Sequence, residues 1–176
     1  MKAFFRELLI TLTIAAVIAT VWNATFQTFV IFMTSMMPTF QEGQRLLVNK
    51  ATYFFGEPER GDVIIFDRGQ NGDYIKRIIA LPGDNVEIKE KAVYINGSRL
   101  DEPYIKNPPG YTVAEQEIPD NMYFVLGDNR NNSADSHNGW LVERGDIIGK
   151  AWLSIWPIDR LDASLNYPLQ EQLTGF

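Results

Sequence analysis

The side chains that could carry out hydrolysis in this chain are a serine, a lysine and a histidine. Ser35 begins the segment Ser-Met-Met-Pro-Thr, Lys76 lies in a run of apolar residues, and His137 follows Asp135 by two positions. A serine hydroxyl is a weak nucleophile at neutral pH and needs an adjacent base. A lysine can be that base only as a neutral amine, and burial can lower its pKa of about 10.4 by roughly 3–5 units. The residue types alone do not decide whether Lys76 or His137 is the base, because a serine–histidine–aspartate triad is recognised by geometry and not by sequence order.

The composition excludes several other chemistries. The 176 residues contain no cysteine and a single histidine, which excludes thiol catalysis, disulfides and a metal site built from cysteine or clustered histidine. The formal net charge of −6 argues against nucleic acid as a partner, because phosphate binding needs a basic face. We therefore expect no metal, no cofactor and no nucleic acid.

Four segments resemble, in order, the signature motifs of bacterial type I signal peptidases. Residues 35–39 are similar to the nucleophile motif Ser-Met-x-Pro-Thr, and residues 74–84 to the segment that carries the catalytic lysine. Residues 127–136 resemble the last signature, Gly-Asp-Asn-x-x-x-Ser-x-Asp-Ser, and residues 61–63 match a weaker box. Three long matches in the family's order identify the chain as a member of this family of serine proteases with a lysine base.

The resemblance implies a role for several residues. Ser35 would be the nucleophile, Lys76 its general base, and Ser133 the hydroxyl that holds the lysine amine in line with Ser35. Such an orienting group is needed because the lysine stem is flexible. Neighbouring residues on a strand face opposite sides, so Arg77 would point away from Lys76, towards a carboxylate such as Asp128. The residues to which we assign a supporting role are Asp128, Arg77 and Asp135.

The family cleaves after small residues at the first and third positions before the cut. The resemblance implies shallow apolar pockets for these residues, and the alternative for each lining position is plain core packing. The positions that could line the pockets are Ile31, Met36, Tyr74 and Ile75.

Two positions depart from the family pattern. His137 stands where the family usually has an arginine, and we interpret it as a partner of Asp135 and not as a base. Met33 stands where many members place a hydroxyl that helps the Ser35 N–H bind the oxyanion. A second donor is therefore not identified, and a backbone N–H or an ordered water is the simplest substitute.

The elements that must position these groups begin with an apolar N-terminal segment. A helix over residues 8–26 would span roughly 28 Å at ~1.5 Å per residue, close to the ~30 Å core of a bilayer. Lys2 and Arg6 precede it, and no further lysine or arginine occurs before Arg45. This asymmetry predicts an N-terminus in the cytoplasm and the rest of the chain outside. We interpret residues 1–27 as a cytoplasmic tip and membrane anchor; a cleaved secretory signal and a buried core helix are the alternatives.

After the anchor, short apolar runs with period-two alternation are typical of strands. Asn96-Gly97 indicates a two-residue hairpin, since a type I′ turn needs positive φ at both positions. The predicted strands are residues 29–33, 45–49, 62–66, 74–80, 85–88, 92–95, 122–126 and 147–155. We predict an all-β, antiparallel, partly closed, barrel-like catalytic domain over residues 28–176, preceded by one transmembrane helix.

The expected function is that of a membrane-anchored serine endopeptidase that removes N-terminal signal peptides from exported preproteins. Its partners would be signal peptides with small residues before the cleavage site and the lipid bilayer. The catalytic domain would lie on the outer face of the bacterial cytoplasmic membrane. A self-cleaving repressor with the same dyad would need a DNA-binding domain, which the sequence lacks. The second alternative, an inactive membrane-tethered β domain, conflicts with the intact Ser35, Lys76 and Ser133.

Overall fold

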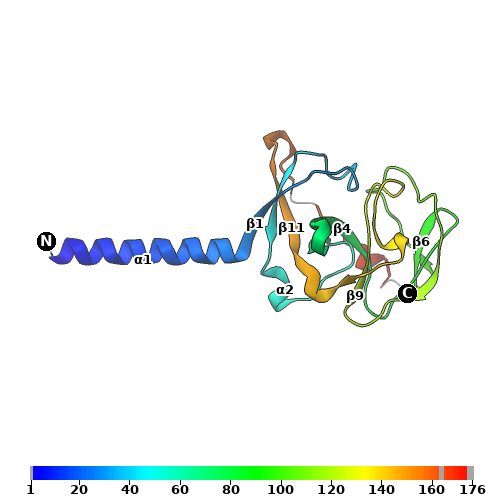
Figure 1. Ribbon diagram of the computed structural model, residues 1–176, viewed down its shortest axis with the longest axis horizontal. Helices are drawn as coiled ribbons and strands as arrows, with labels where there is room; N and C mark the ends of the chain where they lie inside the picture. Colours follow the sequence, from blue (N-terminus) through cyan, green and yellow to red (C-terminus); the bar gives the residue numbers. More distant parts are fainter. Residues whose placement is uncertain (1, 163–164, 174–176) are drawn as a thin grey trace.

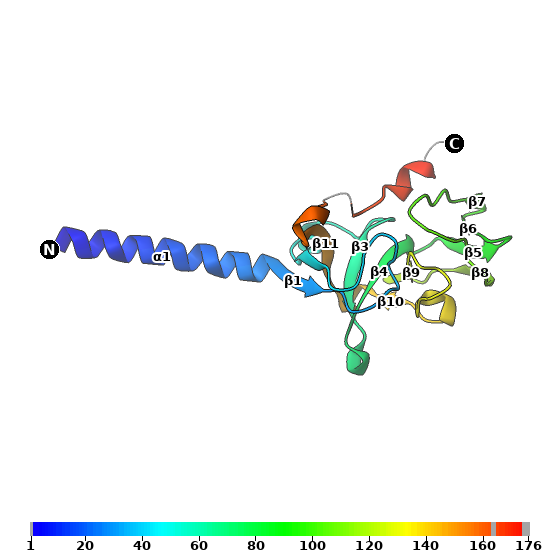
Figure 2. The same cartoon turned by 90° about the horizontal axis from the view of Figure 1, so that it is seen from above.

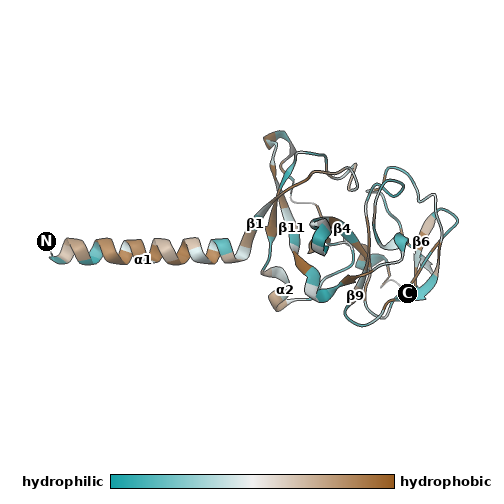
Figure 3. Cartoon of the chain, viewed as in Figure 1, coloured by the Kyte–Doolittle hydropathy of each residue, from teal (hydrophilic) through white to brown (hydrophobic). Residues whose placement is uncertain are grey.

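The computed structural model describes residues 2–162 and 165–173. Helix α1 (Lys2–Thr25) extends away from a β-rich body, and none of its side chains is buried (Figure 1). Most of its residues are hydrophobic (Figure 3). At ~1.5 Å per residue its 24 residues span roughly 36 Å, enough to cross a bilayer core. Within the described residues it is the only helix long and apolar enough to do so. The predicted N-terminal helix is therefore present, although it begins six residues before position 8.

A large antiparallel sheet forms the part of the body next to α1. The order of its strands in the described chain is β1-β2-β11-β3-β4-β9-β10. Their bounds are β1 Phe26–Val30, β2 Arg45–Asn49, β3 Val63–Asp67, β4 Asp73–Ala80, β9 Met122–Leu126, β10 Val142–Glu143 and β11 Ile147–Trp156. Strand β4 pairs with β3 on one side and β9 on the other, so the residues of β4 are held rigidly within the sheet.

A smaller antiparallel sheet lies at the end of the body opposite α1 (Figure 2). Its strands have the order β7-β6-β5-β8, with bounds β5 Asn85–Lys89, β6 Ala92–Ile95, β7 Ser98–Arg99 and β8 Val113–Glu117. Asn96 and Gly97 join β6 to β7 with φ values of 53° and 79°. Both angles are positive, as the predicted type I′ hairpin requires.

Short helices fill the connections. They are α2 (Thr52–Phe55) and the 3₁₀ turns η1 (Gly69–Asn71), η2 (Ser136–Asn138), η3 (Arg144–Asp146), η4 (Ile158–Arg160) and η5 (Leu169–Gln172). The buried apolar side chains divide into clusters on the two faces of the large sheet and beneath the small one. One cluster includes Ile31, Met36, Phe40 and Ile75, and it supports the turn that carries Ser35.

The predicted antiparallel β architecture is confirmed, but no strand pairing in residues 2–162 and 165–173 closes either sheet into a barrel. The predicted strand 29–33 is displaced, because β1 starts at Phe26, directly where α1 ends. Strand β8 was not predicted from the sequence. Its sequence Val-Ala-Glu-Gln-Glu carries no buried residue, so it lacks the alternation that marks a half-buried strand.

Candidate active site

Ser35 lies in a tight turn between β1 and β2. The Met37 N–H donates to the Thr34 carbonyl, and the Phe40 N–H donates to the Met36 carbonyl. Met36 and Phe40 are fully buried, so apolar packing fixes the turn from below. This packing holds Ser35 against the sheet, where its side chain meets β4.

Lys76 reaches Ser35 from the middle of β4. Its Nζ lies 2.8 Å from Ser35 Oγ and also donates to the Ile75 carbonyl at 2.8 Å. The lysine side chain is almost completely buried. Burial lowers the pKa of Lys76 to about 8, while the carboxylates of Asp135 and Asp128 oppose that shift. A substantial fraction of such amines is neutral near physiological pH, so the pair has the geometry and the basicity for proton transfer.

Residues 127–138 close the site from the other side. The Asn129 N–H donates to the Ser35 carbonyl at 2.9 Å, and its Nδ2 donates to the Thr34 carbonyl at 3.1 Å. A Cβ on Gly127 would lie 2.4 Å from the Ser35 carbonyl oxygen and 2.3 Å from Ser133 Oγ. Only glycine therefore allows this loop to approach the nucleophile so closely.

Ser133 lines the same pocket as Ser35 and Lys76. Its hydroxyl is buried and has no hydrogen-bond partner in the described part of the chain. The predicted bond from Ser133 to the lysine amine is thus not formed in this state, and the orienting role of Ser133 stays a prediction.

A pocket of about 640 Å³ opens over the Ser35–Lys76 pair. Tyr74 lines it, as the sequence predicted, and its ring centroid lies 5.3 Å from Lys76 Nζ. The other predicted pocket residues, Ile31, Met36 and Ile75, are buried in the core cluster below, so their part in substrate binding stays a prediction. The lining residues that the sequence did not suggest are Phe32, Thr34, Asn131, Asn132, Ala134 and Asn138.

The positions of Met33 and His137 bear on the two departures from the family pattern. Met33 lines the pocket and is half exposed, and a second oxyanion donor is still not identified. His137 Nδ1 lies 2.6 Å from Asp135 Oδ1, and its ring stacks on Tyr111 with centroids 4.0 Å apart. Ser35 Oγ forms its side-chain hydrogen bond with Lys76, so the geometry favours the lysine as base over a triad through His137.

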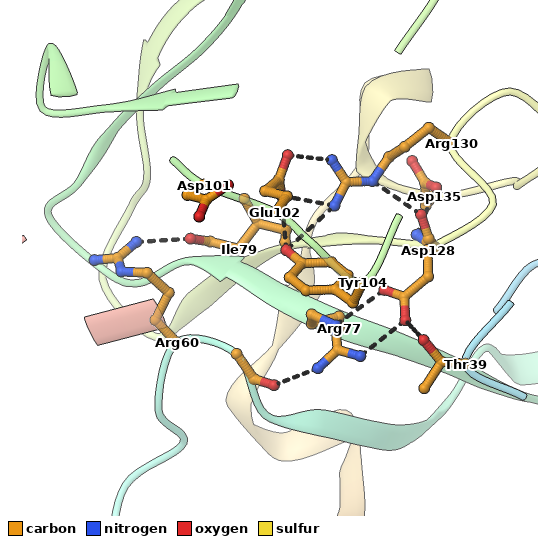
Figure 4. A network of polar contacts seen from close by, with 12 residues as sticks. Thr39, Arg60, Arg77, Ile79, Asp101, Glu102, Tyr104, Asp128, Arg130 and Asp135 are labelled. Carbon is orange, nitrogen blue, oxygen red and sulfur yellow. Dashed lines mark hydrogen bonds and ion pairs between the residues drawn. The ribbon is translucent and has the colours of Figure 1, made fainter. Parts of the chain in front are cut away.

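Behind the dyad, Arg77 and Asp128 form a buried ion pair (Figure 4). Arg77 Nε and Nη2 donate to the two carboxylate oxygens of Asp128 at 2.9 and 2.8 Å. The hydroxyl of Thr39, which ends the serine motif, donates to the same carboxylate. The pairing of Arg77 with Asp128 that the strand alternation suggested is present, and it ties β4 to the Ser35 turn.

A second ion pair continues this network. Arg130 donates both Nη atoms to Glu102, at 2.8 and 2.7 Å. The ring of Tyr104 lies 4.2 Å from Arg77 Cζ and 5.8 Å from Arg130 Cζ, so it separates the two guanidinium groups (Figure 4). Neither Glu102 nor Tyr104 could be singled out from the sequence, because both lie in an irregular loop without periodicity.

A buried serine with a lysine amine at hydrogen-bond distance is the arrangement that a serine protease with a lysine base requires. A protein-family model for signal peptidase, peptidase S26, matches residues 4–156. The chain therefore belongs to the signal peptidase family, peptidase S26, and the family predicted from the motifs is confirmed.

Individual relatives agree with this assignment. A probable signal peptidase I-2 of Synechocystis sp. is 43% identical over 135 residues, which are 73% of this chain and 62% of that protein. Signal peptidase IB of Staphylococcus aureus is 34% identical over 185 residues, with 94% of this chain and 97% of that protein covered. The match thus spans less than two thirds of the Synechocystis relative. The crystal structure of a signal peptidase I from Enterococcus faecalis is similar with a TM-score of 0.49 and 34% identity, over 54% of this chain and 97% of that one.

Proposed function

We propose that this chain is a type I signal peptidase that cleaves N-terminal signal peptides from exported preproteins. The observation that carries the proposal is the 2.8 Å contact between Ser35 Oγ and a buried Lys76 amine in a member of this family. The open pocket above the pair leaves room for a peptide backbone next to the nucleophile.

In the proposed mechanism, Ser35 Oγ attacks the carbonyl carbon of the scissile bond while neutral Lys76 takes the hydroxyl proton. The Ser35 N–H stabilises the resulting oxyanion. The tetrahedral intermediate collapses as protonated Lys76 gives its proton to the leaving amine, which leaves an acyl-enzyme ester on Ser35. Lys76 then deprotonates a water molecule that hydrolyses the ester and frees Ser35. Ser133 would orient the Lys76 amine through these steps.

The proposed division of the chain follows from the same argument. Residues 1–27 form the cytoplasmic tip and membrane anchor, and residues 28–176 form the catalytic domain on the outer face. Lys2 and Arg6 at the start of α1 support this orientation. Because β1 begins where α1 ends and Ser35 follows soon after, the site would lie near the membrane surface, where the cleavage site of a signal peptide emerges.

The decisive test is the incubation of the purified chain in detergent with a preprotein that has alanine at the first and third positions before the cut. We expect one cleavage after the second alanine, detected by mass spectrometry of the products. The matched substrate with bulky residues at both positions should stay intact. Absence of cleavage with the unchanged chain would favour the alternative, a membrane-tethered β domain without activity.

The pH dependence of cleavage should report on Lys76. The active form contains the neutral amine, which predominates above the pKa, so kcat/KM should rise with pH through an apparent pKa of about 8. Burial is the main cause of this low value and the Asp135 carboxylate opposes it. Asp135→Asn should therefore move the ascending limb to lower pH. A limb at the same pH in this variant would contradict the electrostatic link between the two residues.

A further inference from the structure

A second pocket, of about 340 Å³, lies at the junction between α1 and the β-rich body. Its walls include Ala24 near the end of α1 together with Lys50, Tyr53, Phe54, Arg144 and Ile148. In Figure 1, α2, which carries Tyr53 and Phe54, lies on the side of the body from which α1 extends. The pocket is therefore separate from the active site, and it lies where a membrane-spanning α1 would leave the bilayer.

Both charged side chains in this pocket are positive. Lys50 Nζ donates to the Asn23 carbonyl at 3.1 Å, one of the last carbonyls of α1. Arg144 Nη2 donates to the Tyr53 carbonyl at 2.6 Å. A lysine ammonium has three donors and a guanidinium five, so each cation has N–H groups left for a ligand.

No carboxylate of the described residues lines the pocket. Arg144 Nε pairs with Glu57 at 3.1 Å, but that carboxylate is 81% exposed and does not line the pocket. Asp62 accepts a hydrogen bond from the Tyr53 hydroxyl and pairs with Lys150. The pocket is therefore lined by two cations, and the Glu57 carboxylate that competes for Arg144 is exposed to solvent.

Aromatic side chains lie in the pocket wall and on the elements next to it. Phe54 and Phe55 of α2 are 79% and 96% exposed. On the strand that follows α1, Phe26 contacts Trp22 and stacks on Trp152, with centroids 4.7 and 5.3 Å apart. Exposed aromatic side chains at this level are typical of the interface between membrane and water. A ligand of this pocket would have an anionic group between the two cations and hydrocarbon next to the aromatic rings.

We propose that the pocket binds the headgroup phosphate of an anionic phospholipid, with the acyl chains lying along α1 and Phe54. The inference rests on the proposed anchoring of α1 in the membrane, because only there does the pocket meet lipid headgroups at high local concentration. Lys50 and Arg144 would contact the phosphate, and the bound lipid would fix the height of the catalytic domain above the bilayer. The proposed lipid site uses Lys50 and Arg144 and does not involve Ser35 or Lys76.

Lipid binding can be measured on the full chain in neutral detergent by native mass spectrometry. The probes are phosphatidylglycerol and, as the control whose zwitterionic headgroup has no net charge, phosphatidylcholine. We expect phosphatidylglycerol to bind more tightly, and Lys50→Gln to weaken its binding about five-fold, since one cation near an anionic membrane surface contributes about that factor. Glu57→Gln should strengthen binding, because it removes the competitor for Arg144.

Arg99→Gln is the matched control, since Arg99 lies in the small sheet at the opposite end of the body. It should leave phosphatidylglycerol binding unchanged. Equal binding of the two lipids, or the same affinity in Lys50→Gln as in the unchanged chain, would overturn the proposal. Ser35→Ala should bind lipid normally, and Lys50→Gln should cleave a soluble peptide in detergent normally, so a failure of the lipid site and a failure of the proposed peptidase activity are distinguishable.

Discussion

Ser35→Ala and Lys76→Ala are each expected to lower kcat for preprotein cleavage by between about 10⁴ and 10⁶, with the fold intact. The reason is that the hydroxyl and the amine act as one unit across a 2.8 Å contact, so neither contributes without the other. The double variant should therefore be scarcely slower than either single variant. Single-turnover cleavage with enzyme in excess measures the loss.

Two results would contradict this account of the dyad. Substantial activity in Lys76→Ala would remove the lysine as base. An inactive His137→Ala, with normal folding, would favour the triad that the geometry disfavours. His137→Ala should instead retain most activity, because its ring contacts Asp135 and Tyr111 and not Ser35.

The variant Lys76→Met can show that activity is lost because the base is missing and not because the chain fails to fold. Burial lowers the pKa of Lys76 from 10.5 to about 8. Below pH 8 the amine is charged in both the folded and the unfolded chain, and burying this charge lowers the free energy of unfolding. The loss becomes smaller as the pH rises from 8 to 10.5. A shift of this size corresponds to roughly 3 kcal/mol, and methionine removes it without leaving a cavity. We expect Lys76→Met to be inactive and yet more stable than the unchanged chain at pH 7, as measured by thermal unfolding in detergent.

The sequence predicted the family and the positions of most strands because both depend on local patterns. The motif around Ser35 and the apolar run around Lys76 are contiguous, and the strands at 45–49, 92–95 and 122–126 agree with the observed bounds. The hairpin at Asn96-Gly97 is a two-residue signal whose physical cause is the positive φ of both residues.

What the sequence did not predict depends on contacts between distant segments. Glu102 meets Arg130 across 28 positions, and Asn129 meets Thr34 across 95, with no spacing that would connect them beforehand. The residues that line the active-site pocket were also difficult to predict from the sequence. Ile31 and Phe32 are both apolar, but only the structure distinguishes the buried side chain of Ile31 from that of Phe32, which is exposed at the pocket.

A large loss of stability is expected when Arg77 is replaced. Arg77→Met should lower the free energy of unfolding by about 3–5 kcal/mol, because it leaves the carboxylate of Asp128 buried without its cation. The Gly61 and Leu165 carbonyls, to which Arg77 Nη1 donates at 2.9 and 3.1 Å, lose their donor as well. Thermal unfolding of the full chain in detergent measures the loss. Lys89→Met is the control: its pair with Glu87 is exposed, so the unfolding midpoint should hardly move.

Replacing both partners, as Arg77→Met with Asp128→Leu, tests whether the pair serves stability or the geometry of the site. An apolar pair of similar volume needs no compensating charge, so most of the lost stability should return. Activity should not return, because Thr39 loses the carboxylate that ties the Ser35 turn to β4. Asn129, next to position 128, would then hold the Ser35 carbonyl less firmly. We expect the double variant to be folded but at least about ten-fold slower in kcat, since small displacements of a reacting group are costly. Full activity in a stable double variant would show that this buried pair has no part in positioning Ser35.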